Sequence, residues 1–290
     1  RVSSKPDKII FIDSIEDYNH KEGLALSDDE IKYLDQVSIK LGRKLTDSEV
    51  FGFSQVNSEH CRHKIFNGEF HLDGQKMEST LFEMIKLTSK KNKKNLISAY
   101  KDNVAFITGP EIELFTTNKK DSPDYYEIRK IKTSISLKAE THNFPTTVEP
   151  FSGAATGSGG EIRDRMAGGQ ASLPLAGSAV YMTSYPRTSK SKKWEDAQIK
   201  KSWLYQNPKD ILVKASNGAS DYGNKFGQPL INGSLLTFEH SENDHNVGYD
   251  KVIMLAGGIG FGKEKETKKK KISDGDYIVV LGGDNYRIGM

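Results

Sequence analysis

The sequence predicts an α/β fold of the α+β type, because segments with helical periodicity and segments with strand alternation follow one another along the chain. Two capping-box signatures predict helices near the N-terminus, and strict alternation from Ile131 to Glu140 predicts a strand. The 290 residues suffice for one large domain or two ordinary ones. A content of 36% hydrophobic and 28% charged residues is typical of a globular protein.

The first predicted helix begins after Ser27, whose hydroxyl would cap it while Glu30 returns to close the box. Gly42 supplies the stop signal at the end of this helix. The second predicted helix begins after Thr46, with Glu49 as its returning acid, and ends near residues 57–60. These signals predict a helical segment at the start of the chain.

The later helices and strands are predicted from the spacing of apolar residues, which differs between helices and strands. A further amphipathic helix is predicted around Thr80–Thr88, and a weakly patterned, lysine-rich stretch at 188–208 is interpreted as a domain boundary. Besides 131–140, the predicted strands are 103–108 (NVAFIT), 210–215 (DILVKA), 251–258 (KVIMLAGG) and 277–283 (YIVVLGG).

Composition excludes several classes of protein. No apolar run approaches the roughly 20 residues that cross a bilayer, and no signal peptide is visible, so we expect no membrane partner. The single cysteine excludes a disulfide framework and suits a cytoplasmic location. Lysine-rich stretches at 86–95 and 263–271 lack the interleaved aromatic residues of single-strand binders, so we expect solvated loops and no nucleic-acid partner.

The stretch GAATGSGGEIRD is neither a Walker loop nor a dinucleotide fingerprint, because its glycine spacing fits neither motif. Its glycines would let consecutive backbone N–H groups approach an anion, Arg163 suits phosphate oxygens, and Asp164 suits Mg²⁺. The alternative is a flexible glycine loop without a ligand. The candidate nucleotide-binding residues are Gly153, Ala154, Ala155, Thr156, Gly157, Ser158, Gly159, Gly160, Glu161, Ile162, Arg163 and Asp164.

Glu140 ends the clearest strand shortly before this stretch and could share a cation with Asp164. His142 and Asn143 follow in a predicted turn that Pro145 closes. A carboxylate, an imidazole, an amide and an arginine this close in sequence suit magnesium–nucleotide chemistry. Each polar residue taken alone also fits a turn former or a surface group.

The stretch NSEHCRHK, residues 57–64, allows several interpretations. A zinc site is disfavoured because His60 and Cys61 are neighbours and no second ligand pair follows. A Cys61 nucleophile would need a well-placed base, which the adjacent histidine is not. The charges also suit a helix C-terminus, but their density exceeds what capping requires, and a histidine is the usual proton handler.

The motifs NSEHCRHKIFN, ETHNFP and GAATGSGGEIRD resemble, in this order, the synthetase part of large-form phosphoribosylformylglycinamidine synthases, glutamine-dependent enzymes of purine biosynthesis. The upstream GLALSDDEIKYL and LGRKLTDSE resemble the helical linker of that family. SAYKDNVAF, YGNKFGQPLING and VIMLAGGIG extend the resemblance over nearly the whole chain. Three long motifs in register are far more specific than one glycine-rich stretch.

The resemblance implies a helical linker over residues 1–60, an aminoimidazole-ribonucleotide-synthetase-like α/β subdomain over 61–187, and the start of a second α/β subdomain over 188–290. It also implies an interior piece of a longer enzyme that uses ATP and Mg²⁺ to convert formylglycinamide ribonucleotide into formylglycinamidine ribonucleotide. Ammonia would come from a glutaminase domain outside this chain, so the chain alone is expected to be inactive.

Residue by residue, the resemblance implies catalytic roles for His60 and His142. It implies Mg²⁺ ligation by Glu140 and Asp164, ATP binding by the glycine-rich stretch, and further nucleotide contacts from Asn232, Gly233 and Ser234. The family often has a second histidine where this chain has Phe144, which shifts weight to His142.

Two alternative functions remain. One is another ATP-using member of the same superfamily, such as a small-molecule kinase, which the linker together with NSEHCRHK disfavours. The other is a noncatalytic module that binds a nucleotide for structural reasons.

Overall fold

A computed structural model describes residues 8–57, 63–119, 122–188, 190, 192–196, 206–277 and 279. The chain divides into two compact units, residues 1–91 (unit 1) and residues 92–290 (unit 2). This division lies between the boundaries expected after residues 60 and 187, and the latter falls inside unit 2. None of the helices in the described part of the chain is both long and apolar enough to span a membrane.

Unit 1 is mainly helical, as the capping boxes predict. Its elements are α1 (Ile15–Glu22), α2 (Asp28–Leu41), α3 (Asp47–Val56), α4 (His63–Asn67), β1 (His71–Leu72), β2 (Gln75–Lys76) and α5 (Leu81–Lys91). Both capping boxes are present, and α2 ends at Gly42, which adopts a φ of 65°. The helix predicted around 80–88 is α5.

Apolar side chains from α1, α2, α3 and the segments that flank them form the core of unit 1. Val50 is fully buried and Leu34 is nearly so. Ile12, Ile15, Leu24 and Leu45 complete this cluster. Burying these side chains supplies most of the stability of short helices, because propensity alone leaves them marginal in water.

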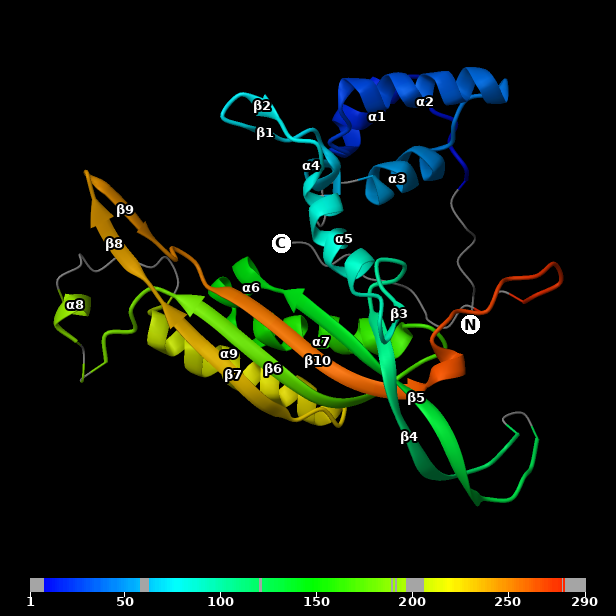
Figure 1. The fold of residues 1–290 in the computed structure, drawn as a ribbon. Coiled ribbons are helices and arrows are strands. Elements are labelled where there is room, and N and C mark those ends of the chain that lie inside the picture. The colour runs from blue at the N-terminus through cyan, green and yellow to red at the C-terminus, as the bar shows by residue number, and fades with distance from the viewer. Residues whose placement is uncertain are drawn as a thin grey trace. The chain divides into compact units, whose positions relative to one another are not determined.

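Unit 2 is built on a six-stranded sheet with strand order β3-β4-β5-β10-β6-β7 (Figure 1). All neighbours are antiparallel except β6 and β7, which are parallel. The strands are β3 (Leu96–Ser98), β4 (Ala105–Thr116), β5 (Glu127–Thr141), β6 (Leu173–Thr183), β7 (Leu230–Thr237) and β10 (Ile253–Lys263). The predicted strands at 131–140 and 251–258 are therefore confirmed, and the one at 103–108 is the start of β4.

The remaining elements of unit 2 connect these strands. They are α6 (Asn143–Val148), α7 (Pro150–Ala167), α8 (Lys193–Asp196), α9 (Pro208–Lys225), the hairpin β8 (Glu239–Glu242) and β9 (His245–Gly248), and a 3₁₀ turn (Glu264–Glu266). The strand predicted at 277–283 lies almost entirely outside the described residues.

Helices α7 and α9 lie side by side on one face of the sheet (Figure 1). Between them and the sheet lies the core of unit 2, a cluster of mostly small and medium-sized side chains. Its members are Ala154, Ala179, Tyr181, Ile211, Ala215, Ala219, Val252, Met254 and Ala256. Small residues allow helix and sheet to approach closely, so packing here depends on shape more than on large apolar groups.

The prediction of a strand at 210–215 is wrong, because this segment lies inside α9. Asn207 caps the helix by accepting a hydrogen bond from the Asp210 N–H at 3.0 Å, and Pro208 occupies the first turn. The buried residues Ile211, Ala215 and Ala219 are spaced by four, which is helical periodicity. A window of six residues was too short to reveal that period.

The prediction that Gly153–Asp164 forms an open loop with free amides is also wrong, because this stretch lies within α7. The helix begins with Pro150 in its first turn, and the Gly153 N–H donates to the Glu149 carbonyl at 2.7 Å. In a helix the backbone amides beyond the first turn are bonded to carbonyls four residues earlier. The stretch therefore offers no nest of amides to an anion.

The glycines of α7 provide space instead. A Cβ added to Gly153 would lie 2.5 Å from the Pro145 carbonyl oxygen, and one on Gly157 would lie 2.9 Å from Met254 Sδ. Larger residues at these positions would push α7 away from α6 and β10. Glycine has a low helix propensity, and the close packing that it allows here compensates for the loss of helix stability.

A buried polar network fastens α7 to the sheet. Arg165 and Glu161 are both almost completely buried, and the Arg165 Nε donates to the Glu161 carboxylate at 2.8 Å. The Gln228 side chain bonds to both residues. On β10, a Cβ added to Gly258 would lie 2.6 Å from an Arg165 nitrogen and a Glu161 oxygen, so glycine there makes room for the ion pair.

We expect Gly218→Ala to lower the free energy of unfolding by about 1–3 kcal/mol, the usual cost of overpacking. Gly218 lies in α9, and an added Cβ would overlap the carbonyl oxygen of Phe151 in α7. Calorimetric melting measures the effect. The control is Gly52→Ala in α3, where an added Cβ meets nothing within 4 Å and alanine should stabilise the helix by up to about 1 kcal/mol. Equal tolerance at both positions would contradict the packing described for α7 and α9.

Acid should weaken the start of α3. The Arg43 guanidinium and the Thr46 N–H lower the pKa of Glu49 from 4.5 to about 2. Because the pKa falls on folding, this carboxylate stabilises unit 1 above about pH 4.5, and the contribution is lost as pH falls towards 2. A carboxyl NMR titration of Glu49 checks this value. Arg43→Gln should return the midpoint towards 4.5, and a wild-type midpoint already near 4.5 would refute the expectation.

Candidate functional site

One cluster of charges lies where the end of β5 meets α7. Lys138 and Glu140 are two residues apart on β5 and therefore share one face of the sheet, the face that α7 covers. The Lys138 Nζ lies 2.9 Å from an Asp164 carboxylate oxygen and 3.4 Å from a Glu140 carboxylate oxygen. The structure thus brings Glu140 and Asp164 to one place, with an ammonium group between them.

The two carboxylates keep the Lys138 amine protonated. Burial alone would lower the pKa of Lys138, but the hydrogen bond and charge of Asp164, together with Glu140, outweigh burial and raise it. Two carboxylates and one ammonium leave a net negative charge at this point. Such a site suits a cation or, if the lysine turns, a magnesium ion with a phosphate bound beside it.

His142 lies directly after β5 and precedes α6. Its backbone N–H donates to the Met254 carbonyl at 3.1 Å, and its carbonyl accepts a hydrogen bond from the Thr146 hydroxyl. The imidazole Nδ1 is buried and has no hydrogen-bond partner in the described structure. A buried ring nitrogen without a partner is costly, so it is a natural position for a ligand or a water molecule to bind.

The turn predicted at ETHNFP is the short helix α6 rather than an irregular turn. The Asn143 side chain accepts a hydrogen bond from the Met254 N–H at 3.0 Å, and the Thr147 hydroxyl accepts one from the Val252 N–H at 3.1 Å. These bonds join α6 to the start of β10. Asn143 is therefore a structural residue, a role that the sequence did not reveal, and Phe144 is exposed.

Helix α7 divides the predicted nucleotide-binding residues into two groups. Seven of them are buried: Gly153, Ala154, Gly157, Ser158, Gly159, Glu161 and Ile162. The others keep surface accessible: Ala155, Thr156, Gly160, Arg163 and Asp164. Glu161 and Ile162 act in packing and in the Arg165 network, so only the second group can contact a ligand through side chains.

Arg163 is exposed but held in place. Its Nη1 donates to the Tyr222 hydroxyl at 2.9 Å, and its guanidinium lies 5.8 Å from the centre of the Tyr222 ring. Tyr222 in turn stacks on Phe226 at 4.9 Å. This arrangement keeps an arginine at the surface of α7 next to Asp164, where a phosphate could bind it.

Asn232, Gly233 and Ser234 lie elsewhere, on the edge strand β7. They line a cavity of about 530 Å³ together with Tyr181 and two serines of α9. Because β10 and β6 lie between β5 and β7, three strand spacings of roughly 5 Å each separate these residues from Glu140. The structure therefore does not bring them to the acidic pair.

The cavity beside β7 has one buried polar group. The Tyr181 hydroxyl is buried without a hydrogen-bond partner in the described structure, and burial raises the pKa of Tyr181 to about 12. It is therefore a neutral donor at physiological pH. No signal in the sequence marks Tyr181 as a functional residue, because an aromatic residue among apolar neighbours predicts only burial.

In unit 1, His60 and Cys61 lie outside the described residues, but both ends of their motif are described. One Glu30 carboxylate oxygen accepts a hydrogen bond from the Asn57 side chain at 2.5 Å and pairs with the Lys64 ammonium. The other oxygen accepts the Ser27 N–H at 2.9 Å. Burial would raise the pKa of Glu30, but Lys64 and Ser27 lower it. The Glu30 carboxylate thus joins the start of α2 to both ends of the NSEHCRHK motif.

A family model matches part of unit 1. Residues 15–64 match the model of the formylglycinamide ribonucleotide amidotransferase linker domain. The match covers α1 to α3 and ends at Lys64. The resemblance of this segment to that family's linker is confirmed.

Solved structures show weaker similarity. PurL from Thermotoga maritima complexed with ADP is 23% identical, with a TM-score of 0.41, and the match covers 81% of this chain and 28% of PurL. PurL of the same organism complexed with FGAR is 24% identical, with a TM-score of 0.37. The protein tt0281 from Thermus thermophilus is 13% identical over 46% of this chain and 34% of its own, with a TM-score of 0.31. This chain spans less than a third of PurL.

Lys138→Met should lower the free energy of unfolding by about 1–3 kcal/mol at pH 7, because Asp164 and Glu140 would then face each other without the ammonium. Adding Asp164→Asn should recover part of this loss in a double-mutant cycle. Denaturant titration measures both. Lys251→Met, at an exposed position before β10, is the control and should change stability by less than about 0.5 kcal/mol. Additive effects of the two substitutions would show that the cluster is not coupled.

Proposed function

We propose that this chain is part of a formylglycinamide ribonucleotide amidotransferase, an ATP-dependent ligase of purine biosynthesis that forms formylglycinamidine ribonucleotide. The linker-domain match over residues 15–64 is the observation that carries this proposal. The motifs ETHNFP and GAATGSGGEIRD support it, because they place His142, Glu140 and Asp164 around the junction of β5, α6 and α7.

The proposed reaction replaces an amide oxygen by nitrogen. The amide oxygen of the substrate takes the γ-phosphoryl group of ATP, which gives an iminophosphate, and ammonia then attacks that carbon and displaces phosphate. Catalysis of phosphoryl transfer is largely positioning and neutralisation of charge. Ammonia would come from a glutaminase domain outside this chain, and the chain is proposed to act in the cytoplasm.

Glu140 and Asp164 are the proposed ligands of Mg²⁺. The donor set fits this ion, since Mg²⁺ is commonly bound by one or two carboxylates with phosphate oxygens and water completing its shell. The ion would neutralise phosphate charge when bound. Lys138 lies within hydrogen-bond reach of Asp164, so its ammonium can turn to a phosphate oxygen without leaving the cluster.

The proposed role of His142 follows from its buried, unpartnered Nδ1, which can bind a polar atom of the substrate or the nucleotide. By resemblance, His60 acts at the reacting carbon by stabilising charge or moving a proton. Arg163 and the accessible residues of α7 are proposed phosphate contacts. Because the amides of α7 are consumed within the helix, side chains must supply most of this binding.

Calorimetric titration with ATP, with and without Mg²⁺, tests the site. We expect magnesium-dependent binding that Asp164→Asn weakens about tenfold or more, which corresponds to at least about 1.4 kcal/mol. The matched control is Asp221→Asn, which removes an exposed carboxylate of α9 paired with Lys225 and should leave binding unchanged.

Binding that needs no Mg²⁺, or that Asp164→Asn leaves intact, would overturn the proposed metal site. Normal binding by a chain that forms no amidine once the missing parts are supplied would favour a noncatalytic nucleotide module. In the complete enzyme, His142→Ala should reduce amidine formation at least about a hundredfold, the usual loss when one hydrogen bond to the reacting groups is removed.

A further inference from the structure

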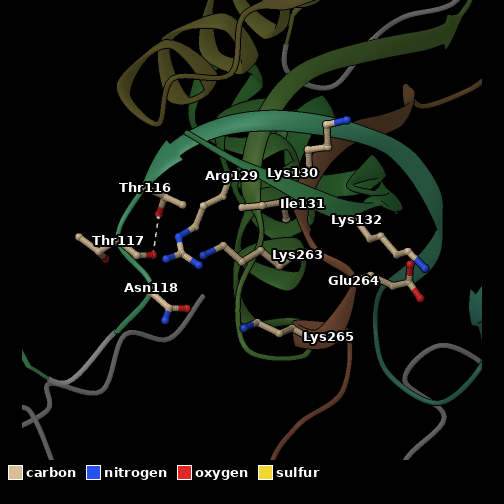
Figure 2. Close-up of a pocket in the computed structure, with 10 residues that line it drawn as sticks. All are labelled: Thr116, Thr117, Asn118, Arg129, Lys130, Ile131, Lys132, Lys263, Glu264 and Lys265. Carbon is tan, nitrogen blue, oxygen red and sulfur yellow. Dashed lines mark hydrogen bonds between the residues drawn. The ribbon is translucent and has the colours of Figure 1, made fainter. Parts of the chain in front are cut away.

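A second cavity lies at the opposite end of β5 from His142. It has a volume of about 420 Å³ and is formed by the end of β4, the start of β5 and the end of β10 (Figure 2). Its lining residues are Thr116, Thr117, Asn118, Arg129, Lys130, Ile131, Lys132, Lys263, Glu264 and Lys265. Arg129 and Lys138 are nine positions apart on β5, which is roughly 30 Å in an extended strand. The cavity is therefore distinct from the acidic cluster.

The lining is strongly basic. Five of the ten lining residues are lysine or arginine, and one is acidic. Figure 2 shows the ends of Arg129, Lys263 and Lys265 turned towards the same hollow, with Asn118 at its rim. The Glu264 carboxylate points away from them, on the side of Lys132. Like charges that converge in a concave site repel each other and create a positive potential that favours an anion.

The hydrogen-bonding capacity of these cations is only partly used. The Arg129 guanidinium pairs with Glu127 through one terminal nitrogen, but its Nε is buried and has no partner in the described structure. Within the described ranges, Lys263 and Lys265 form no ion pair. A buried guanidinium N–H without an acceptor is costly, and an oxyanion would satisfy it.

We propose that this cavity binds a multiply charged phosphate anion, held by Arg129, Lys263 and Lys265. The planar guanidinium matches two phosphate oxygens, and the two ammonium groups can neutralise the remaining charge. The cavity volume is within the range of small-molecule sites. The side chains of Thr116 and Asn118 are the uncharged groups at hand to contact an ester or bridging oxygen. This site lies outside the proposed nucleotide site and does not depend on it.

Calorimetric titration with inorganic pyrophosphate, without nucleotide or Mg²⁺, tests the proposal. Lys263→Gln and Arg129→Gln should each weaken binding about tenfold or more. The matched control is Lys251→Gln, which removes an exposed positive charge just before the opposite end of β10 and should leave binding within about twofold. Melting curves of the variants show whether the fold is retained.

Three results would overturn the proposal: no pyrophosphate binding by the wild type, binding that Lys263→Gln leaves intact, or equal weakening by Lys251→Gln. The last would indicate attraction by net charge alone. Asp164→Asn should not reduce pyrophosphate binding, so failure of the proposed nucleotide site and failure of this one give different results.

Discussion

The close approach of α7 to the sheet is the constraint on which the architecture of unit 2 depends. Gly157 on the helix and Gly258 on β10 leave no room for side chains at this contact, and Gly153 does the same where α7 meets α6. The space at Gly258 holds the buried pair of Glu161 and Arg165. Removing one partner of such a pair would leave a buried charge without a partner, which typically lowers stability by about 3–5 kcal/mol. Small residues and a buried ion pair together fix the position of the helix.

Fixing α7 also determines which of its residues can do chemistry. Glu161 faces β10 and is bonded to Arg165 and Gln228, whereas Asp164, one turn later, meets Lys138 of β5. The two acidic residues of one helix therefore have different roles: Glu161 belongs to the buried network and Asp164 to the charge cluster. The difference arises from position, because Glu161 is almost completely buried whereas Asp164 keeps part of its surface accessible.

The sequence predicted those features that depend on local interactions. The capping boxes at Ser27 and Thr46 were confirmed because each one satisfies amides within four residues. The alternation at 131–140 predicted β5 and correctly placed Lys138 and Glu140 on one face. The expected proximity of Glu140 and Asp164 is found as well, but it arises from the helix α7, which brings Asp164 to Lys138 beside Glu140.

The predictions that were wrong concern residues whose role depends on contacts with distant parts of the chain. Glycine permits unusual backbone angles and also permits close packing, and the sequence of α7 does not say which property is in use. The segment at 210–215 was apolar enough for a strand, but its helical period emerges only over all of α9. Glu30 was predicted as a capping residue, yet its second function, joining Asn57 to Lys64, depends on contacts 27 and 34 positions away. No local pattern carries that information.

The two ends of β5 show how one strand can carry two different electrostatic environments. At its end, the ammonium of Lys138 lies between two carboxylates, which leaves a net negative charge. At its start, Arg129 shares a hollow with Lys263 and Lys265, and Glu127 is the one carboxylate that pairs with any of the three in the described structure. A folded protein gains nothing in stability from converging like charges, since they raise the free energy of the native state. Their arrangement around a cavity is therefore more readily explained by an anionic ligand than by folding.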